Sequence, residues 1–180
     1  MTYRDELLQL LVKKSLKRGD FTLSSGQKST YYIDGKLTTL DSRGGFLVAR
    51  IFLAMLADDV PDAVGGLTLG ADPIVGAVLA LAGMEDLELK GFIVRKQAKE
   101  HGTQSLVEGR LEKGDRVVVV EDVLTTGASS LKAIQAVREL GCEVDRVLAV
   151  VDREQGAREN LKKERCRAEA IFSVSELLRG

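Results

Sequence analysis

Residues 117–130 read VVVVEDVLTTGASS, and this stretch decides the fold class. The four valines, Val117 to Val120, predict a strand buried on both faces, as in a parallel sheet that helices cover. Two carboxylates, Glu121 and Asp122, stand at the carboxyl end of that strand, and a Thr-Thr-Gly turn leads from there into a predicted helix. The stretch therefore predicts an α/β protein with a site at the end of this strand.

The residues that follow the valines are typical of a phosphate site. Backbone N–H groups at a helix start, the positive end of the helix dipole and the hydroxyls of Thr125, Thr126 and Ser129 can surround a phosphate monoester. Glu121 and Asp122 would repel the same anion, so they need hydroxyl groups or a metal ion as partners. A sugar phosphate supplies both chemistries. The alternative is that the Thr and Ser side chains only cap the helix.

Helices and strands are predicted to alternate along the chain, which favours one domain over residues 1–180 with a mainly parallel sheet covered on both faces. A small hairpin in residues 1–40, with strands at 21–23 and 29–33, is expected to stand apart from this sheet. Apolar spacing predicts the remaining elements. The helices are expected at 7–16 (ending at Gly19), 46–56, 73–82 and 128–140, and the strands at 63–69, 91–94, 116–120, 146–151 and 170–172.

Composition excludes several classes of protein. The 26 basic and 27 acidic residues leave a formal net charge of −1, which favours neither nucleic acid nor an anionic membrane as a partner. Cys142 and Cys166 have neither metal-ligand spacing nor a disulfide pattern, as expected in a reducing cytoplasm. Residues 1–5 are too polar for a signal peptide, and the uncharged stretch 73–84 is too short to span a bilayer. We expect a cytoplasmic protein.

Polar segments follow three predicted strands, where ligands of open α/β sheets bind. The turn at residues 70–73 offers backbone amides for a second phosphate group. Arg153 follows the strand at 146–151. The segment 95–109 is long and polar, which indicates either a mobile lid that closes over an anion or a solvated surface loop. Its cations and the single histidine of the chain are Arg95, Lys96, Lys99 and His101.

These motifs together resemble a known family. The 117–130 stretch is similar to the phosphoribosyl pyrophosphate signature of type I phosphoribosyltransferases. With four further motifs, the chain closely resembles the orotate phosphoribosyltransferase family over nearly its whole length. The further motifs are Phe21-Thr22-Leu23-x-Ser25-Gly26, Ser29-x-Tyr31-Tyr32-Ile33-Asp34, Arg95-Lys96-x-x-Lys99-x-His101-Gly102 and Asp152-Arg153.

The resemblance implies a fold and a reaction. The fold is the type I phosphoribosyltransferase fold, a central mainly parallel sheet flanked by helices, with the N-terminal residues 1–40 forming a hood. The reaction transfers ribose 5-phosphate from phosphoribosyl pyrophosphate to N1 of orotate, which gives orotidine 5′-monophosphate and pyrophosphate in pyrimidine biosynthesis. A Mg²⁺ cofactor would bridge pyrophosphate and ribose hydroxyls.

The resemblance also implies roles for individual residues. Lys99 would lead catalysis by stabilising the departing pyrophosphate, with His101 and Asp122 contributing. Arg95, Lys99 and His101 would reach into the neighbouring site of a homodimer, whereas Lys96 would act in its own subunit. Glu121 and Asp122 would hold the ribose hydroxyls, directly or through Mg²⁺. The implied phosphoribosyl pyrophosphate contacts are Arg95, Lys96, Lys99, His101, Glu121, Asp122, Val123, Leu124, Thr125, Thr126, Gly127, Ala128 and Ser129.

Orotate carries a carboxylate that needs a cationic partner. Arg153 offers the planar, bidentate geometry that suits this group, and the resemblance adds Thr125 as a second orotate contact. The alternative for Arg153 is a surface ion pair with Asp152 or Glu154.

The chain departs from the family pattern at two positions, and other features fit more than one interpretation. Many family members have a lysine at Ser24 and another within residues 70–74, and this chain has neither. Tyr31 and Tyr32 fit either base stacking or core packing. A phosphoribosyltransferase for uracil or a purine is an alternative, as is a non-catalytic regulator of the same fold that binds nucleotides or nucleic acid.

Overall fold

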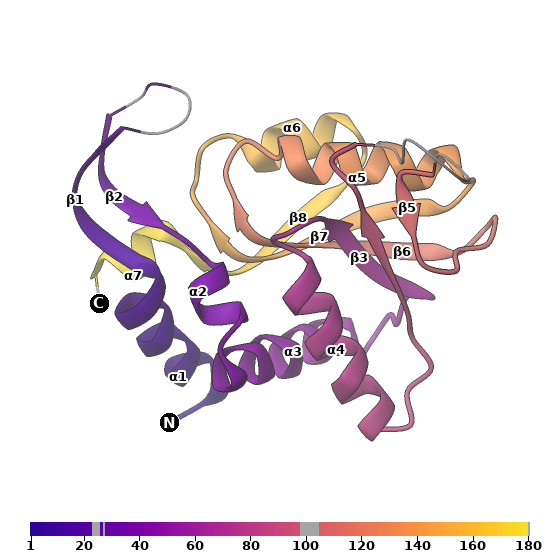
Figure 1. Ribbon diagram of the computed structural model, residues 1–180, viewed down its shortest axis with the longest axis horizontal. Coiled ribbons are helices and arrows are strands. Elements are labelled where there is room, and N and C mark those ends of the chain that lie inside the picture. Colours follow the sequence, from indigo (N-terminus) through magenta and orange to yellow (C-terminus); the bar gives the residue numbers. More distant parts are fainter. Residues whose placement is uncertain (23–25, 27, 98–104, 180) are drawn as a thin grey trace.

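The computed structural model describes residues 1–22, 26, 28–97 and 105–179. A six-stranded sheet lies between two layers of helices, and a separate two-stranded hairpin projects from one side (Figure 1). The predicted fold class is confirmed. Along the sheet the strand order is β5-β4-β3-β6-β7-β8. Its strands are β3 (Ala63–Leu67), β4 (Lys90–Val94), β5 (Val107–Glu108), β6 (Arg116–Leu124), β7 (Glu143–Asp152) and β8 (Arg167–Ser173).

The direction of the chain along the sheet reverses between β3 and β6. All neighbouring strands run parallel except β5, which pairs antiparallel with the end of β4. The chain adds β4 on one side of β3 and then continues with β6 on the other side. Ligands of such sheets bind outside the carboxyl ends of the strands at this point. A ligand site is therefore expected at the end of β6.

Helices cover both faces of the sheet. On one face, α5 (Ala128–Glu139) contacts β3, β6 and β7, and α6 (Ala157–Lys163) contacts β8. On the other, α4 (Asp72–Met84) contacts β3, β4 and β6, and α3 (Ser42–Leu56) packs on α4. Val117 and Val119 lie in the apolar cluster that contains α5, whereas Val118 and Val120 lie in the cluster that contains α3 and α4. The alternation of side chains along β6 confirms the strand buried on both faces.

The N-terminal region forms the predicted hairpin, with different boundaries. Helix α1 (Tyr3–Leu10) continues as one π-helical segment, η1 (Leu11–Ser15), and strand β1 (Leu16–Thr22) follows directly. The hairpin is β1 with β2 (Lys28–Ile33), and the short helix α2 (Lys36–Thr39) comes next. The expected helix at 7–16 is thus wrong at its end, because Leu16 pairs with Ile33 in the hairpin. The C-terminal helix is α7 (Val174–Arg179).

The bounds of several other elements also differ from the predicted ones. The strands β6, β7 and β8 extend beyond the ranges expected from apolar residues alone, because polar residues at both ends of a strand still pair with its neighbours. Helices α2, α6 and α7 were not predicted. Among the described residues, no helix is both long enough and apolar enough to cross a bilayer.

Candidate active site

The turn between β6 and α5 forms a small cradle. Gly127 precedes the helix with φ of +83°, a conformation that favours glycine, and no side chain caps the first turn of α5. A cavity of about 70 Å³ lies against this helix start. It is lined by Glu121, Val123, Leu124, Thr125, Thr126, Gly127, Ala128 and Ser129. The capping alternative is therefore wrong, and the helix amides face a hollow of a size that suits a small anion.

A neighbouring helix holds the cradle in place. The Asn160 side chain on α6 donates a hydrogen bond of 3.0 Å to the carbonyl oxygen of Thr126. Leu124 is 1% exposed and anchors the end of β6 in the core, whereas Ser129 is exposed at the cavity. The turn is thus held both by α6 and by the core.

The two carboxylates lie close together at the end of β6, since one point above Gly70 is 2.4 Å from Asp122 Oδ1 and 3.1 Å from Glu121 Oε1. Glu121 accepts a hydrogen bond of 3.2 Å from the buried Ser130 hydroxyl on α5. Asp122 lies toward the hood, where its Oδ2 atom is 3.9 Å from the Lys36 ammonium. Both residues are buried, each with 7% of its surface exposed.

Burial controls the ionisation of this pair. Removal from water, with the adjacent Asp122 charge adding to it, raises the pKa of Glu121 to about 8. Burial also raises the pKa of Asp122, and the Lys36 charge opposes that rise. A cation or hydroxyl donors brought by a ligand would favour the charged forms. The pair is therefore suited to a ligand that carries a cation or hydroxyl donors.

Two glycines let the chain approach Asp122 closely. A Cβ atom on Gly70, in the turn after β3, would lie 2.4 Å from Asp122 Oδ1 and 3.1 Å from Glu121 Oε1. A Cβ atom on Gly35, just before α2, would lie 2.9 Å from Asp122 Oδ2. Only backbone therefore fits on these sides of the carboxylates.

The same turn narrows one expectation. The amide of Ala71 donates to the Leu67 carbonyl and that of Asp72 donates to the Leu69 carbonyl, both at 3.3 Å. These two amides are used within the turn, so the expectation of a second phosphate site narrows to the amide of Gly70, which has no hydrogen-bond partner among the described residues. Binding of a phosphate group there stays a prediction.

Arg153 lies at the end of β7, beside the end of β6. It is 8% exposed, and its guanidinium lies over the Tyr31 ring, 5.2 Å from the ring centroid. Within the described residues, its Nε and Nη2 atoms have no hydrogen-bond partner. Asp152 instead accepts from Arg158 at 2.7 Å, and Glu154 accepts from Ser175. The alternative of an Arg153 ion pair with either acidic neighbour is therefore wrong.

Tyr31 and Tyr32 lie in different surroundings in the structure. Tyr31 lies under Arg153 and packs against the apolar core, whereas Tyr32 is 40% exposed with its ring 5.8 Å from that of Phe21. Lys36 was missed among the site residues. The signal was the polar Asp34-Gly35-Lys36 sequence directly after a strand of the hairpin, where a glycine permits close approach.

The 95–109 segment is only partly a loop. Val107 and Glu108 form β5, and the amide of Arg95 donates to the Leu106 carbonyl at 2.8 Å, which closes the base of the segment. Arg95 pairs with Glu108 at 3.0 Å, and Lys96 is exposed beside it. Lys99 and His101 lie outside the described residues.

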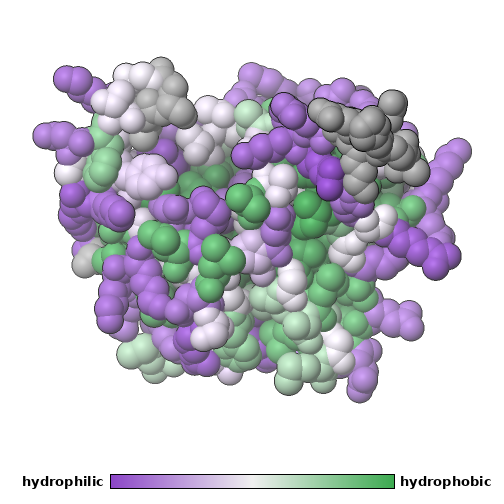
Figure 2. Space-filling model, viewed as in Figure 1, coloured by the Kyte–Doolittle hydropathy of each residue, from purple (hydrophilic) through white to green (hydrophobic). Residues whose placement is uncertain are grey.

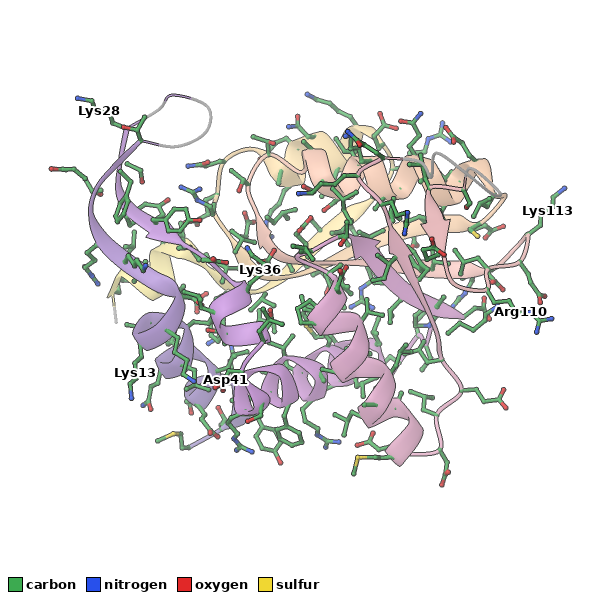
Figure 3. All side chains as sticks on the ribbon, in the orientation of Figure 1. Lys13, Lys28, Lys36, Asp41, Arg110 and Lys113 are labelled. Atoms are coloured by element: carbon green, nitrogen blue, oxygen red, sulfur yellow. The ribbon has the colours of Figure 1, made fainter. Side chains whose placement is uncertain are left out.

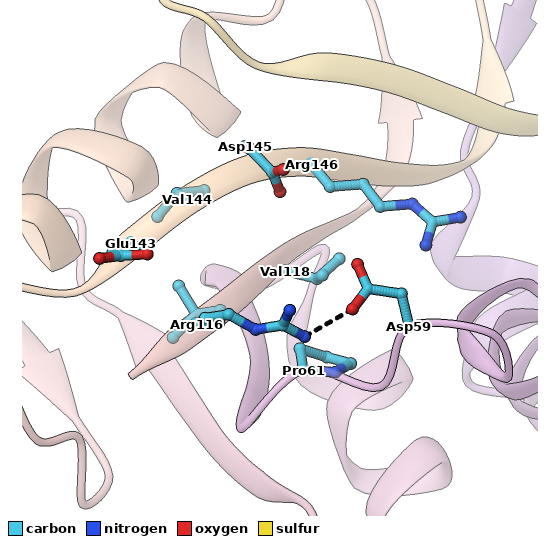
Figure 4. A pocket seen from close by; sticks show the side chains of 9 residues that line it. Asp59, Pro61, Arg116, Val118, Glu143, Val144, Asp145 and Arg146 are labelled. Carbon is cyan, nitrogen blue, oxygen red and sulfur yellow. Dashed lines mark hydrogen bonds and ion pairs between the residues drawn. The ribbon is translucent and has the colours of Figure 1, made fainter. Parts of the chain in front are cut away.

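A second hollow lies at the other edge of the sheet. It has a volume of about 180 Å³ and is lined by residues at the amino ends of β6 and β7 (Figure 4). Its arginines already have partners: Arg116 pairs with Asp59 at 2.7 Å, and Arg146 pairs with Glu169 at 2.8 Å. Open amides and unpaired polar atoms are instead found at the carboxyl edge, which we take as the site.

Comparisons with known proteins agree with this assignment. The family model described as "Phosphoribosyl transferase domain" matches residues 40–175, more than half of the chain. An orotate phosphoribosyltransferase of Aquifex aeolicus (strain VF5) is 48% identical over 99% of both chains. Another from Synechocystis sp. (strain ATCC 27184 / PCC 6803 / Kazusa) is 47% identical over 97% of this chain and 88% of its own length.

A solved structure gives the same answer. The crystal structure of Mycobacterium tuberculosis H37Rv orotate phosphoribosyltransferase in complex with 5-phospho-alpha-D-ribosyl 1-diphosphate superposes with a TM-score of 0.83 at 39% identity. The match covers 98% of this chain and 99% of the other, so it includes the hood. The chain has the type I phosphoribosyltransferase fold and belongs to the orotate phosphoribosyltransferase family.

Proposed function

We propose that this site transfers ribose 5-phosphate from phosphoribosyl pyrophosphate to N1 of orotate, releasing pyrophosphate. The observation that carries the proposal is the grouping of three features at one edge of the sheet. These are the uncapped start of α5, the buried carboxylate pair and the unpartnered nitrogens of Arg153. Leu124 at the end of β6 pairs with Asp152 at the end of β7, so the carboxyl ends of these two strands lie side by side. Each feature suits a different part of the two substrates.

The cradle and the carboxylates would bind different parts of the phosphoribosyl group. The amides of Thr126 to Ser129, together with the hydroxyls there, would hold the 5-phosphate at the positive end of the α5 dipole. Glu121 and Asp122 would accept hydrogen bonds from the ribose hydroxyls. Negative charge on these carboxylates also suits the positive charge that develops on the ribose as pyrophosphate departs.

Mg²⁺ is proposed as the cofactor, held mainly through substrate and water oxygens. In the described part of the chain, no group of three or more His, Cys, Asp or Glu side chains is placed to hold a metal ion. The donor set that is present, two buried carboxylates side by side, fits a hard cation that keeps most ligands from its substrate. When bound, Mg²⁺ neutralises charge on the pyrophosphate leaving group.

Arg153 is proposed to bind the orotate carboxylate. Its unpaired Nε and Nη2 atoms are adjacent donors of the kind that bind a carboxylate in two parallel hydrogen bonds. A buried guanidinium without an anion is costly, so the site favours a base that carries one. Uracil and the purines lack this group, which favours orotate over them. Thr125, half-buried between the cradle and β7, is the second proposed contact.

A homodimer with shared sites is proposed for the cationic segment. Lys99, His101 and Arg95 would reach the neighbouring site, with Lys99 stabilising the leaving pyrophosphate, and Lys96 would act in its own subunit. Leu37, Leu40 and Leu69 expose 46, 73 and 63% of their area, and apolar side chains gather over α2 and α4 on one face of the molecule (Figure 2). Exposed apolar surface of this kind supports an interface between subunits.

A cytoplasmic location is proposed as well. Both cysteines are buried and unpaired, which fits a reducing compartment, and pyrimidine synthesis uses soluble substrates.

Replacing Arg153 tests the proposed contact with the orotate carboxylate. The Arg153→Ala variant should raise the KM for orotate by about a hundredfold, since a buried charge-assisted pair is lost, while the KM for phosphoribosyl pyrophosphate changes little. Arg110→Ala, which removes an exposed arginine, is the matched control and should leave both constants unchanged. Equal increases in both constants for Arg153→Ala would exclude the carboxylate contact.

A further inference from the structure

Lys36 stands at the boundary between the hood and the sheet. It begins α2, and Figure 3 labels it between the hairpin and the central strands. Its ammonium lies 2.7 Å from Asp34 Oδ1 and 3.9 Å from Asp122 Oδ2. No part of the reaction described above uses this cation, although it contacts a carboxylate of the site.

The backbone of Lys36 is held by hydrogen bonds, whereas its side chain is partly exposed. Its amide donates to Asp34 at 3.1 Å, and the α2 amides of Thr38 and Thr39 both donate to Gly35 at 3.0 Å. The Thr38 hydroxyl, fully buried, lies 2.6 Å from that of Ser15. The lysine side chain, in contrast, is 39% exposed and carries a flexible stem. The fold thus places an ammonium on a flexible stem beside Asp122, on a backbone that is held in place.

The position of Lys36 follows from the glycine before it. Gly35 passes so close to Asp122 that any side chain there would collide with the carboxylate. The next residue can therefore place its charge beside Asp122 from the hood side. Glu121 Oε2 accepts from Ser130 on α5, and Glu121 Oε1 lies with Asp122 Oδ1 on the side of Gly70. From the cradle outward, the order is helix start, Glu121, Asp122 and then Lys36.

This order matches the order of groups along phosphoribosyl pyrophosphate. With the 5-phosphate in the cradle and the ribose hydroxyls on the carboxylates, the anomeric carbon and its pyrophosphate lie at the far end from α5. The pyrophosphate is attached next to the C2 hydroxyl, so a C2 hydroxyl held by Asp122 would bring it to the side of that carboxylate that faces Lys36. Three carboxylates, Asp34, Glu121 and Asp122, would otherwise face this polyanion, at a large electrostatic cost.

We propose that Lys36 is a pyrophosphate-binding residue, whose ammonium turns from Asp34 to the pyrophosphate oxygens when the substrate binds. This inference rests on the proposed function and adds a residue from the hood to the site. The competing role is structural, in which Lys36 only orders Asp122 and touches no substrate. The two roles predict different effects of a Lys36 substitution on the binding of pyrophosphate and of ribose 5-phosphate.

Calorimetric titration with two fragments of the substrate separates these roles. Inorganic pyrophosphate with Mg²⁺ probes the leaving-group end, and ribose 5-phosphate probes the cradle and the carboxylates without it. In Lys36→Met, which keeps the length and removes the charge, pyrophosphate should bind about tenfold more weakly, while ribose 5-phosphate binding is unchanged. Lys36→Arg should retain most of the pyrophosphate affinity. Lys13→Met, another exposed lysine of the same region, should behave as wild type.

Each remaining outcome decides the matter. Equal weakening of both fragments in Lys36→Met would overturn the contact and assign Lys36 a positioning role. Unchanged affinity for both would overturn any role in binding, provided thermal unfolding shows a folded variant. If the wild-type protein binds neither fragment, the proposed function fails together with this inference, whereas wild-type binding with an unaffected variant rejects the inference alone.

Discussion

The guanidinium of Arg153, at the end of β7, lies 5.2 Å from the centroid of the Tyr31 ring in the hairpin. The contact joins the hood to the sheet at the proposed orotate site. Because the ring covers one face of the guanidinium and offers no acceptor in its plane, the edge with Nε and Nη2 stays available to a ligand. Tyr31 is therefore placed to orient Arg153 without competing for its hydrogen bonds.

Removal of this ring should affect orotate binding alone. Tyr31→Leu loses the cation–π contact, so the KM for orotate should rise about three- to tenfold, with the KM for phosphoribosyl pyrophosphate unchanged. Tyr31→Phe keeps the ring and should behave as wild type. Steady-state kinetics with each substrate varied in turn measures both constants. A Phe variant as impaired as the Leu variant would show that the hydroxyl, rather than the ring, matters.

A methyl group at Gly70 should weaken substrate binding without unfolding the protein. The new Cβ atom would lie 2.4 Å from Asp122 Oδ1, the end of a side chain that can rotate away. Gly70→Ala should therefore raise the KM for phosphoribosyl pyrophosphate about tenfold through displacement of Asp122.

The control for this change is Gly76→Ala in α4, where the added Cβ meets nothing within 4 Å. It should leave the kinetics unchanged and stabilise the protein by about 0.5–1 kcal/mol, because alanine is the better helix former. Wild-type kinetics in both variants would contradict the close packing of Gly70 on the carboxylate.

Glu121 should make the ligand-free protein less stable as the pH rises. Burial raises its pKa from 4.5 to about 8, so the folded state binds the proton more tightly than the unfolded state. The contribution is complete below the unfolded pKa and is lost as the pH rises toward the folded value, by on the order of 3 kcal/mol between pH 5 and pH 8.

Urea unfolding at a series of pH values measures this effect. Glu121→Gln cannot titrate, so its free energy of unfolding should fall less steeply than that of the wild type over this range. Parallel pH profiles for the two proteins would show that Glu121 is charged in the folded protein at neutral pH.

Lys99→Ala should leave the fold intact and lower turnover by about a hundredfold or more, since a cation that stabilises the leaving group is lost. If sites are shared, Lys99→Ala subunits mixed with Asp122→Asn subunits should regain activity, because one of the two hybrid sites combines intact residues. Subunit exchange is verified by mass spectrometry of a tagged partner. Exchange without regained activity would place Lys99 in its own subunit's site.

The sheet and the cradle could be predicted because their signals are local. Val117 to Val120 have to be apolar on both faces, and the sequence after them has to open a helix, so adjacent residues carry the information. The hairpin boundary could not be predicted in this way. Leu16 fits the helical spacing of the preceding leucines equally well, and only its pairing with Ile33 assigns it to a strand.

The site was predicted in part for the same reason. Glu121, Asp122 and the residues of the α5 turn follow from one stretch, and the structure brings Arg153 beside them. The contacts of Tyr31 with Arg153 and of Lys36 with Asp122 join residues far apart in the chain. Their partners depend on how the hairpin docks on the sheet, which no local pattern specifies.

The most direct test of the central claim is the ultraviolet absorbance of orotate after phosphoribosyl pyrophosphate and Mg²⁺ are added to the purified protein. The account predicts that orotate is consumed, that the signal depends on Mg²⁺, and that uracil, adenine and hypoxanthine are not converted. Conversion of one of those bases in place of orotate, or no conversion of any base by a folded protein, would contradict it.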